Sequence, residues 1–298
     1  TIVIDDSIFK QWLKNMPRGN FYDKFFSGQT KRTQYGFKVQ LIGVAIGDDF
    51  HPLYFQVVSK KGSSKKTALR LLQKVRRIFK ELCKEHELTY PNLYLSVDSG
   101  FTDKKLISYC IKQGIGFIGV PKKNYLFTID GEKLNLKKYT EREYHKQKQA
   151  QEEKYENLGK QSPPFYMRVR AYFNFLKIEV VVLLFQLKGS DKVTAIFCSK
   201  IETMAKTLRR RFFQRTKIEL FFRFLKDTLK IQKSKSERYG DFIKKLSIYI
   251  LKAVICLQFE KYCRKKVRAF RGWAYTKLRH HLIYQSIDLD ELECLVKK

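Results

Sequence analysis

The sequence is poor in acidic residues. Its 298 residues include 29 Asp and Glu against 61 Lys and Arg, which leaves a formal net charge of +32. Such a charge is poorly suited to an enzyme of neutral small molecules. It suits a polyanion, because each Lys or Arg placed near a phosphate releases counterions on binding. The charge balance therefore indicates nucleic acid as the partner.

Cysteine is also scarce, and its spacing excludes two kinds of site. The six cysteines form no Cys-x-x-Cys pair and have no nearby His that would complete a zinc set. We therefore expect reduced thiols, as in the cytosol, with neither a disulfide framework nor a metal finger. The six residues are Cys83, Cys110, Cys198, Cys256, Cys263 and Cys294.

Long apolar runs are missing. Residues 178–187 and 246–259 are interrupted by polar or charged side chains and fall short of the roughly 20 apolar residues that span a bilayer. No signal peptide is visible, and the chain opens with Thr1 rather than Met. We expect a cytoplasmic protein without membrane attachment, whose natural N-terminus lies upstream of Thr1. Hydrophobic residues still make up 44% of the chain, which is enough for a large core.

Hydrophobic periodicity predicts alternating strands and helices in the first part of the chain. The short run at 2–4 stops at Asp5-Asp6, as a buried strand does when it emerges. The resulting order, three strands and then helix, strand, helix, strand, is typical of an α/β mixed sheet flanked by helices. The predicted strands are 2–4, 36–46, 53–59, 93–97 and 116–120, the predicted helices are 67–86 and 103–113, and a hairpin turn is expected at 47–49.

The composition changes at Lys122. Residues 122–200 contain a hairpin signal at Asp130-Gly131, a densely charged stretch at 139–161, and many β-branched and aromatic residues with a turn at 189–190. We interpret this segment as a β-rich insertion in the first domain. Helical patterns follow at 201–231 and 242–257. The predicted division is 1–121 and 201–264 for the core, 122–200 for the insertion, and 265–298 for a basic and then acidic tail.

Because carboxylates are scarce, their positions are informative. Asp5-Asp6 and Asp98 end predicted strands, where reactive groups collect in α/β sheets, and Glu219 lies on a late helix. Two Asp and one Glu that meet would hold two Mg²⁺ ions through oxygen ligands. Such a pair of ions activates water and stabilises the leaving oxygen during attack on phosphorus.

Each acidic position also has a purely structural interpretation. Asp5-Asp6-Ser7 is suited to capping a helix, and Asp98-Ser99-Gly100 is favourable in a turn. Glu219 lies four residues from both Arg215 and Arg223, as in a solvated ion-pair face. No single position decides between the two interpretations.

The helix that carries Glu219 favours the catalytic interpretation. On one continuous helix, Phe212, Arg215, Glu219 and Lys226 fall within an arc of roughly 60°. Burial of the opposite face would aim Glu219 inward, with cations one and two turns away. A metal-binding acid between two groups that hold phosphates is what phosphodiester chemistry requires. The residues of the opposite face are Phe213, Leu220, Phe221, Phe224 and Leu225.

The sequence resembles a known family at these positions. Phe212-x2-Arg215-x3-Glu219-x6-Lys226 is similar to the Tyr-x2-Arg-x3-Glu-x6-Lys signature of DDE transposases of bacterial insertion sequences, the group typified by insertion sequence four. Phe212 stands where the family has Tyr. The strand endings at residues 4–7 and 95–99 resemble the other two family motifs. The resemblance covers roughly residues 1–260.

The resemblance implies a ribonuclease H-like core, interrupted by a β-rich insertion, with Asp6, Asp98 and Glu219 as catalytic metal ligands. Asp6 fits the first position because the family ligand usually precedes Ser or Thr, and Asp5 stays open as the alternative. The implied cofactor is a pair of Mg²⁺ ions, with Mn²⁺ as a substitute. Arg215 and Lys226 would bind phosphates at the transposon end.

The implied partner is double-stranded DNA, both at the element's ends and at the target. A homodimer on DNA, a bacterial nucleoid-associated location and a DNA-reading domain upstream of Thr1 are further expectations. Arg223, Lys122 and Lys123 are candidate DNA-binding residues, although any single basic run is also typical of a solubilising surface. The other basic runs are Lys60-Lys61, Lys65-Lys66, Arg209-Arg210-Arg211 and Arg264-Lys265-Lys266.

Two rival functions remain. One is a non-catalytic DNA-binding protein derived from a transposase. The other is a different ribonuclease H-like DNA nuclease, such as a junction resolvase, which gives no reason for the Arg/Glu/Lys spacing.

Overall fold

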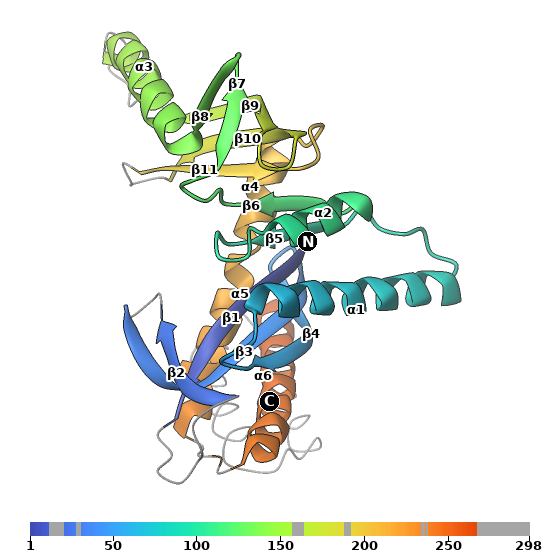
Figure 1. Ribbon diagram of the computed structural model, residues 1–298. Helices are drawn as coiled ribbons and strands as arrows, with labels where there is room; N and C mark the ends of the chain where they lie inside the picture. Colours follow the sequence, from blue (N-terminus) through green and yellow to red (C-terminus); the bar gives the residue numbers. More distant parts are fainter. Residues whose placement is uncertain are drawn as a thin grey trace. The chain divides into compact units, whose positions relative to one another are not determined.

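The computed structural model describes residues 1–11, 21–27, 31–156, 164–187, 192–233, 236 and 238–266 (Figure 1). The chain forms two compact units. The first unit comprises residues 1–5, 42–49 and 64–217, and the second comprises 6–41, 50–63 and 218–298. Strands β1 (Ile2–Lys10) and β3 (Arg32–Ile46) contribute residues to both units.

The first unit has a parallel centre. Strand β5 runs parallel to both β1 and β6, and Val3 is paired with Ser96. Helix α2 connects β5 to β6 and packs against α1. Every residue of β5 and β6 is buried, as expected for parallel strands that are covered on both faces. The elements are α1 (Ser64–Glu85), β5 (Tyr94–Val97), α2 (Lys104–Lys112) and β6 (Gly116–Gly119).

Antiparallel strands extend this sheet beyond β6. The strand order continues from β6 through β11, β10, β9 and β7 to β8, and α3 lies in the chain between β8 and β9 (Figure 1). The described residues of the segment 122–200 therefore form five strands, together with one long helix in its charged stretch. The elements are β7 (Leu126–Ile129), β8 (Glu132–Asn135), α3 (Leu136–Glu156), β9 (Tyr166–Phe173), β10 (Ile178–Gln186) and β11 (Val193–Cys198).

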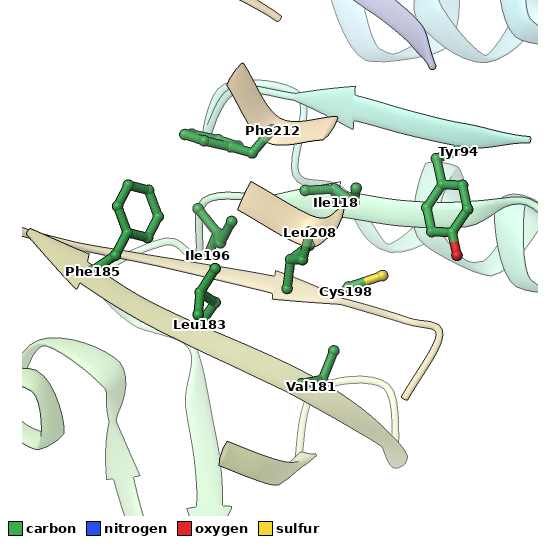
Figure 2. Packing of buried hydrophobic residues seen from close by; sticks show 9 residues of the cluster. All are labelled: Tyr94, Ile118, Val181, Leu183, Phe185, Ile196, Cys198, Leu208 and Phe212. Atoms are coloured by element: carbon green, nitrogen blue, oxygen red, sulfur yellow. The ribbon is translucent and has the colours of Figure 1, made fainter. Parts of the chain in front are cut away.

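One apolar cluster joins this sheet to helix α4 (Ala205–Phe213). Figure 2 shows Leu208 and Phe212 of α4 among side chains from strands β5, β6, β10 and β11. Phe212 packs edge-on against Phe185, with 6.3 Å between the ring centroids. Burial of large apolar side chains is the main stabilising term in such a contact. The strand residues of the cluster are Tyr94, Ile118, Val181, Leu183, Phe185, Ile196 and Cys198.

The second unit is built around aromatic side chains. Strand β3 pairs antiparallel with β2 and also pairs with β4, and Gln11 on the β1 segment donates a 3.2 Å hydrogen bond to Tyr35. Phe242 of α6 stacks on Phe37 at 4.0 Å between centroids and meets Phe9 edge-on at 6.3 Å. The elements are β2 (Tyr22–Ser27), β4 (Asp49–Val58), α5 (Thr216–Arg223), the π-helix η1 (Phe224–Thr228), the 3₁₀-helix η2 (Ile231–Lys233) and α6 (Tyr239–Lys266).

Most predicted elements are present, but two predictions were wrong. The first strand does not end at Asp5-Asp6. It continues to Lys10 because Ile8 and Phe9 both find buried positions. The hairpin at 47–49 and the one at 130–131 are confirmed, whereas the turn predicted at 189–190 lies outside the described residues.

The second wrong prediction is the continuous helix from residue 201 to 231. Helix α4 ends at Phe213, α5 begins at Thr216, and η1 follows as a π-helix. The break has a local cause. Arg215 and Lys217 donate backbone hydrogen bonds three residues back, to Phe212 and Gln214, and the Thr216 hydroxyl bonds the Phe213 carbonyl at 2.8 Å. A side chain that takes up a backbone carbonyl in this way competes with the regular helix.

The described cysteines agree with the expectation of free thiols. Cys83, Cys110, Cys198 and Cys256 form no disulfide. Burial raises the pKa of the Cys110 and Cys198 thiols, which keeps them protonated. The side chains of Cys263 and Cys294 lie outside the described part of the structure. No helix within the described residues has both the length and the apolar character needed to cross a membrane.

Gly36 provides a test of the close approach between β3 and β1. A Cβ atom built at Gly36 would lie 2.1 Å from the carbonyl oxygen of Phe9, which is a severe clash with backbone. The φ of Gly36 is +159°, a value that residues with a side chain rarely adopt. We predict that Gly36→Ala lowers the free energy of unfolding by about 3 kcal/mol, measured by urea denaturation. Gly240→Ala is the control, because a Cβ there meets nothing within 4 Å. Equal stability of the two variants would contradict the prediction.

Candidate active site

Asp98 directly follows β5 and is half-buried. Its carboxylate accepts a 3.2 Å hydrogen bond from the backbone of Phe101. The hydroxyl of fully buried Thr102 lies 3.1 Å from the carbonyl oxygen of Asp98 and 2.9 Å from that of Val120, at the end of β6. Tyr125 donates its hydroxyl to the Thr102 carbonyl at 3.1 Å. The loop that carries Asp98 is therefore tied to the loop that follows β6.

Asp5 reaches the same edge of the first unit. The parallel register pairs Ile2 with Leu95 and Val3 with Ser96. If this register is continued by two residues beyond Val3 and Ser96, Asp5 is paired with Asp98. Neighbouring strands lie about 4.8 Å apart, so two carboxylates at these positions are within reach of a shared ion.

The face of the sheet is the same for both acids. Tyr94 packs in the cluster with Leu208 and Phe212 of α4. Because side chains alternate along a strand, Ser96 and then Asp98 follow on that face. Val3, paired with Ser96, and then Asp5 follow the same alternation on β1. Strand alternation therefore assigns Asp5 and Asp98 to the sheet face that α4 covers.

Asp6 lies on the opposite face of β1 and has a different environment. In the second unit its carboxylate forms a 2.9 Å ion pair with Lys38 of β3, and both side chains are about a quarter exposed. Its charge is therefore balanced across the β1–β3 pair. This arrangement fits a structural role better than that of a metal ligand.

The residues after Asp6 meet the signature segment within the second unit. Lys226, in the π-helix η1, donates a 2.5 Å hydrogen bond to the Ser7 hydroxyl and lies 5.4 Å from the ring centroid of Phe9. Phe222 of α5 meets Phe9 edge-on at 6.1 Å. The two sequence motifs, one at the first strand and one on the late helix, are therefore in direct contact. Asp5 shares the face of β1 that carries Ser7 and Phe9.

The signature residues do not share one helix face. Phe212 is buried in the core of the first unit, and the Arg215 guanidinium lies 5.7 Å from its ring centroid. Glu219 and Arg223 are exposed on α5 in the second unit. The predicted opposite face is only partly correct, since Leu220 is 49% exposed while Phe221 and Leu225 are buried. Ile218 and Phe222, which were not among the residues predicted for the buried face, are also buried.

Lys122 and Lys123 follow β6 in the first unit. Both line a cavity of about 640 Å³ that helix α3 and strand β11 complete. Burial lowers the pKa of Lys122, and the Lys65 ammonium group lowers it further, whereas Asp103 opposes this. Lys123 is exposed.

The donor set of this edge fits a hard divalent cation. Asp5 lies within β1 and Asp98 directly follows the neighbouring strand β5, and their carboxylate oxygens are the kind of ligand that Mg²⁺ and Mn²⁺ take. Across the part of the chain that the structure describes, no three His, Cys, Asp or Glu side chains are grouped closely enough to hold a metal ion. Two protein carboxylates with water and substrate phosphate nevertheless suffice for Mg²⁺.

The comparisons with known proteins bear on this site. The family model described as "Transposase DDE domain" matches residues 9–255. The match includes Asp98, Arg215, Glu219 and Lys226, and it begins just after the Asp5-Asp6-Ser7 motif. A search of curated proteins finds no match to the chain.

Thr102 provides a test of how the Asp98 loop is held. We predict that Thr102→Val, which keeps the side-chain volume but removes the hydroxyl, increases hydrogen exchange at the amides of residues 98–103 about tenfold, because the Asp98 and Val120 carbonyls lose their shared donor. Mass spectrometry of the exchanged protein measures this change. Thr102→Ser keeps the hydroxyl and should retain slow exchange. If both variants exchange alike, the hydroxyl does not hold the loop.

Proposed function

The chain belongs to the family of transposase DDE domains, and from this premise we propose that it cuts DNA at the ends of a mobile element and joins those ends to target DNA. The observation that carries the proposal is the parallel register of β1 and β5, which, continued past Val3 and Ser96, places Asp5 within β1 next to Asp98 at the end of β5. The contact of Lys226 with Ser7 supports it, because it joins the signature segment to the same strand.

The proposed fold of the catalytic core is ribonuclease H-like. The order of the strands supports this proposal. On one side of β1 lie β3 and β4, and on the other side lie β5 and β6, which run parallel to β1. Helices α1 and α2 supply the crossovers before and after β5. We propose that residues 1–121 and 201–264 form this core and that 122–200 is an insertion between the second and third acids. The signature spacing supports membership of the insertion sequence four-like group.

Three acids would hold the metal: Asp5, Asp98 and Glu219. Asp5 replaces Asp6 in this set, because Asp6 is paired with Lys38 while Asp5 follows the register to Asp98. Two Mg²⁺ ions, or Mn²⁺ in their place, would supply Lewis-acid activation of water and stabilisation of the leaving oxygen. Glu219 is exposed, as a residue that approaches substrate must be.

The basic side chains of the protein bind the phosphates of the DNA backbone during the reaction. In the proposed reaction water attacks a phosphorus atom at the element's end, and the bond to the 3′-oxygen breaks, which leaves a 3′-hydroxyl and a 5′-phosphate. That hydroxyl then attacks a second phosphodiester, first to release the element and later to join it to target DNA. Arg215, Arg223, Lys226, Lys122 and Lys123 are the proposed phosphate-binding residues, since guanidinium and ammonium groups neutralise the developing charge.

The proposed working unit is a homodimer on paired DNA ends, in the nucleoid of a bacterial cytoplasm. The net charge of +32 supports DNA as the partner. Cutting both paired ends requires one active centre at each end, and a dimer on the paired ends provides two active centres.

The first functional prediction separates the two adjacent aspartates. Asp5→Asn and Glu219→Gln should each reduce strand nicking at terminal-repeat DNA about 10³-fold, because each removes a metal ligand. Asp6→Asn should retain nicking within about tenfold of the unaltered protein, because Asp6 is balanced by Lys38. The substrate is taken from inverted repeats that flank the coding region, and nicking is read on denaturing gels.

Asp241→Asn, an exposed acid on α6, is the matched control and should have no effect. Loss of nicking in Asp6→Asn together with full activity in Asp5→Asn would reverse the assignment of the first ligand.

The second functional prediction concerns metal removal. Chelation by EDTA should abolish nicking but leave DNA binding intact in a gel-shift assay, and added Mg²⁺ or Mn²⁺ should restore nicking. Unaltered nicking after chelation would contradict metal-dependent catalysis. Binding without nicking under any metal condition would support the rival, a non-catalytic DNA-binding protein.

A further inference from the structure

Two lysines from distant parts of the sequence meet in the first unit. Lys65 lies at the start of α1, and Lys122 follows β6. Their ammonium groups are close enough that Lys65 contributes to lowering the pKa of Lys122, after burial as the larger cause. Two like charges at short range repel each other, so this pair is arranged at a free-energy cost that a bound anion would remove.

The nearby acid does not balance both lysines. Asp103 lies 3.9 Å from the Lys65 ammonium and raises the pKa of Lys122. The same carboxylate caps α2, where it accepts a 3.0 Å hydrogen bond from the backbone of Lys105. One carboxylate against two ammonium groups leaves a net positive charge at this point.

The pair lies next to the loop that carries Asp98. Thr102 bridges the Asp98 and Val120 carbonyls, and Tyr125 donates to the Thr102 carbonyl. The Lys122 ammonium lies 5.6 Å from the ring centroid of Tyr125. Asp103, which approaches Lys65, is the residue directly after Thr102. The two lysines are therefore held at the same end of the sheet as Asp98.

We propose that Lys65 and Lys122 together bind a single phosphate of the DNA strand that lies along the Asp98 edge. This inference rests on the proposed function for the identity of the ligand. It adds Lys65, which belongs to none of the signature motifs, to the DNA-binding residues, and it gives Lys122 a defined partner. A shared phosphate beside the catalytic edge fixes the position of the strand relative to Asp98.

The first experiment is a lysine footprint. The full chain is acetylated with and without duplex DNA of arbitrary sequence, and modification is followed by mass spectrometry. Duplex should slow acetylation of Lys65 and Lys122 at least fivefold and by similar factors. Lys84 and Lys112, exposed lysines near the far ends of α1 and α2, should react at an unchanged rate. Equal protection of all four lysines, or of neither member of the pair, would overturn the proposal.

A second arm identifies the source of the phosphate. Inorganic phosphate at the same phosphate concentration as the duplex should leave the acetylation of both lysines unchanged. Protection by inorganic phosphate as strong as that by duplex would assign the pair to a small anion and overturn the DNA assignment.

Variants test whether one phosphate is shared. Lys65→Gln and Lys122→Gln should each weaken duplex binding about fivefold, and the double variant should be no more than about twofold weaker than the weaker single variant. The salt slope, the change of log K with log salt concentration, should fall by about 0.9 in the double variant. Lys84→Gln and Lys112→Gln are the matched controls. Single effects that multiply in the double variant, with a slope change near 1.8, would show two separate phosphates and contradict the sharing.

The binding experiments and the nicking assay fail independently. Nicking with no protection of the lysines would overturn this inference while the proposed function stands. Protection and a changed salt slope without any nicking would overturn the catalytic function while the phosphate site stands.

Discussion

The parallel pairing of β1 with β5 is the constraint on which the candidate site depends. It fixes which residues of the two strands lie side by side, and a shift by one residue would move every side chain to the other face. Val3 and Ser96 are paired and fully buried, as are their strand neighbours Ile2, Ile4, Leu95 and Val97, and Tyr94 on the same face packs under α4. The core therefore sets the register, and the register sets Asp5 beside Asp98.

Charge reinforces this arrangement. The chain has more than twice as many Lys and Arg as Asp and Glu, and the Asp6 carboxylate forms an ion pair with one of them, Lys38. The Asp98 carboxylate instead accepts a 3.2 Å hydrogen bond from a backbone amide, that of Phe101. A backbone donor orients the carboxylate without adding the charge of a side-chain cation. An acid held in this way is ready to bind a divalent ion, whereas an acid in an ion pair must first lose its partner.

Part of this structure could be predicted from the sequence. Apolar periodicity located most of the strands and both helices of the first 121 residues, because burial decides those elements. Strand β2 (Tyr22–Ser27) was not predicted. The first strand was cut short because two adjacent Asp residues suggest an exit to solvent, yet Phe9 and Ile8 extend it. Neither the β1–β5 register nor the role of Thr102 could be predicted, since both depend on which loops meet in space. The proposal of Asp5 rather than Asp6 as the first ligand rests on that same register.

The signature segment shows why spacing along the chain can be informative even when the implied helix is absent. A single α-helix would bring Arg215, Glu219 and Lys226 to one face, but the chain tightens around Thr216 and widens into a π-helix at Lys226. A π-turn rotates the following side chains away from their α-helical positions, and such turns recur at functional sites. Lys226 is instead positioned by its hydrogen bond to Ser7. The signature spacing therefore corresponds to an irregular backbone that packs against the first strand. Placing the residues on one ideal helix predicts only roughly where their side chains lie.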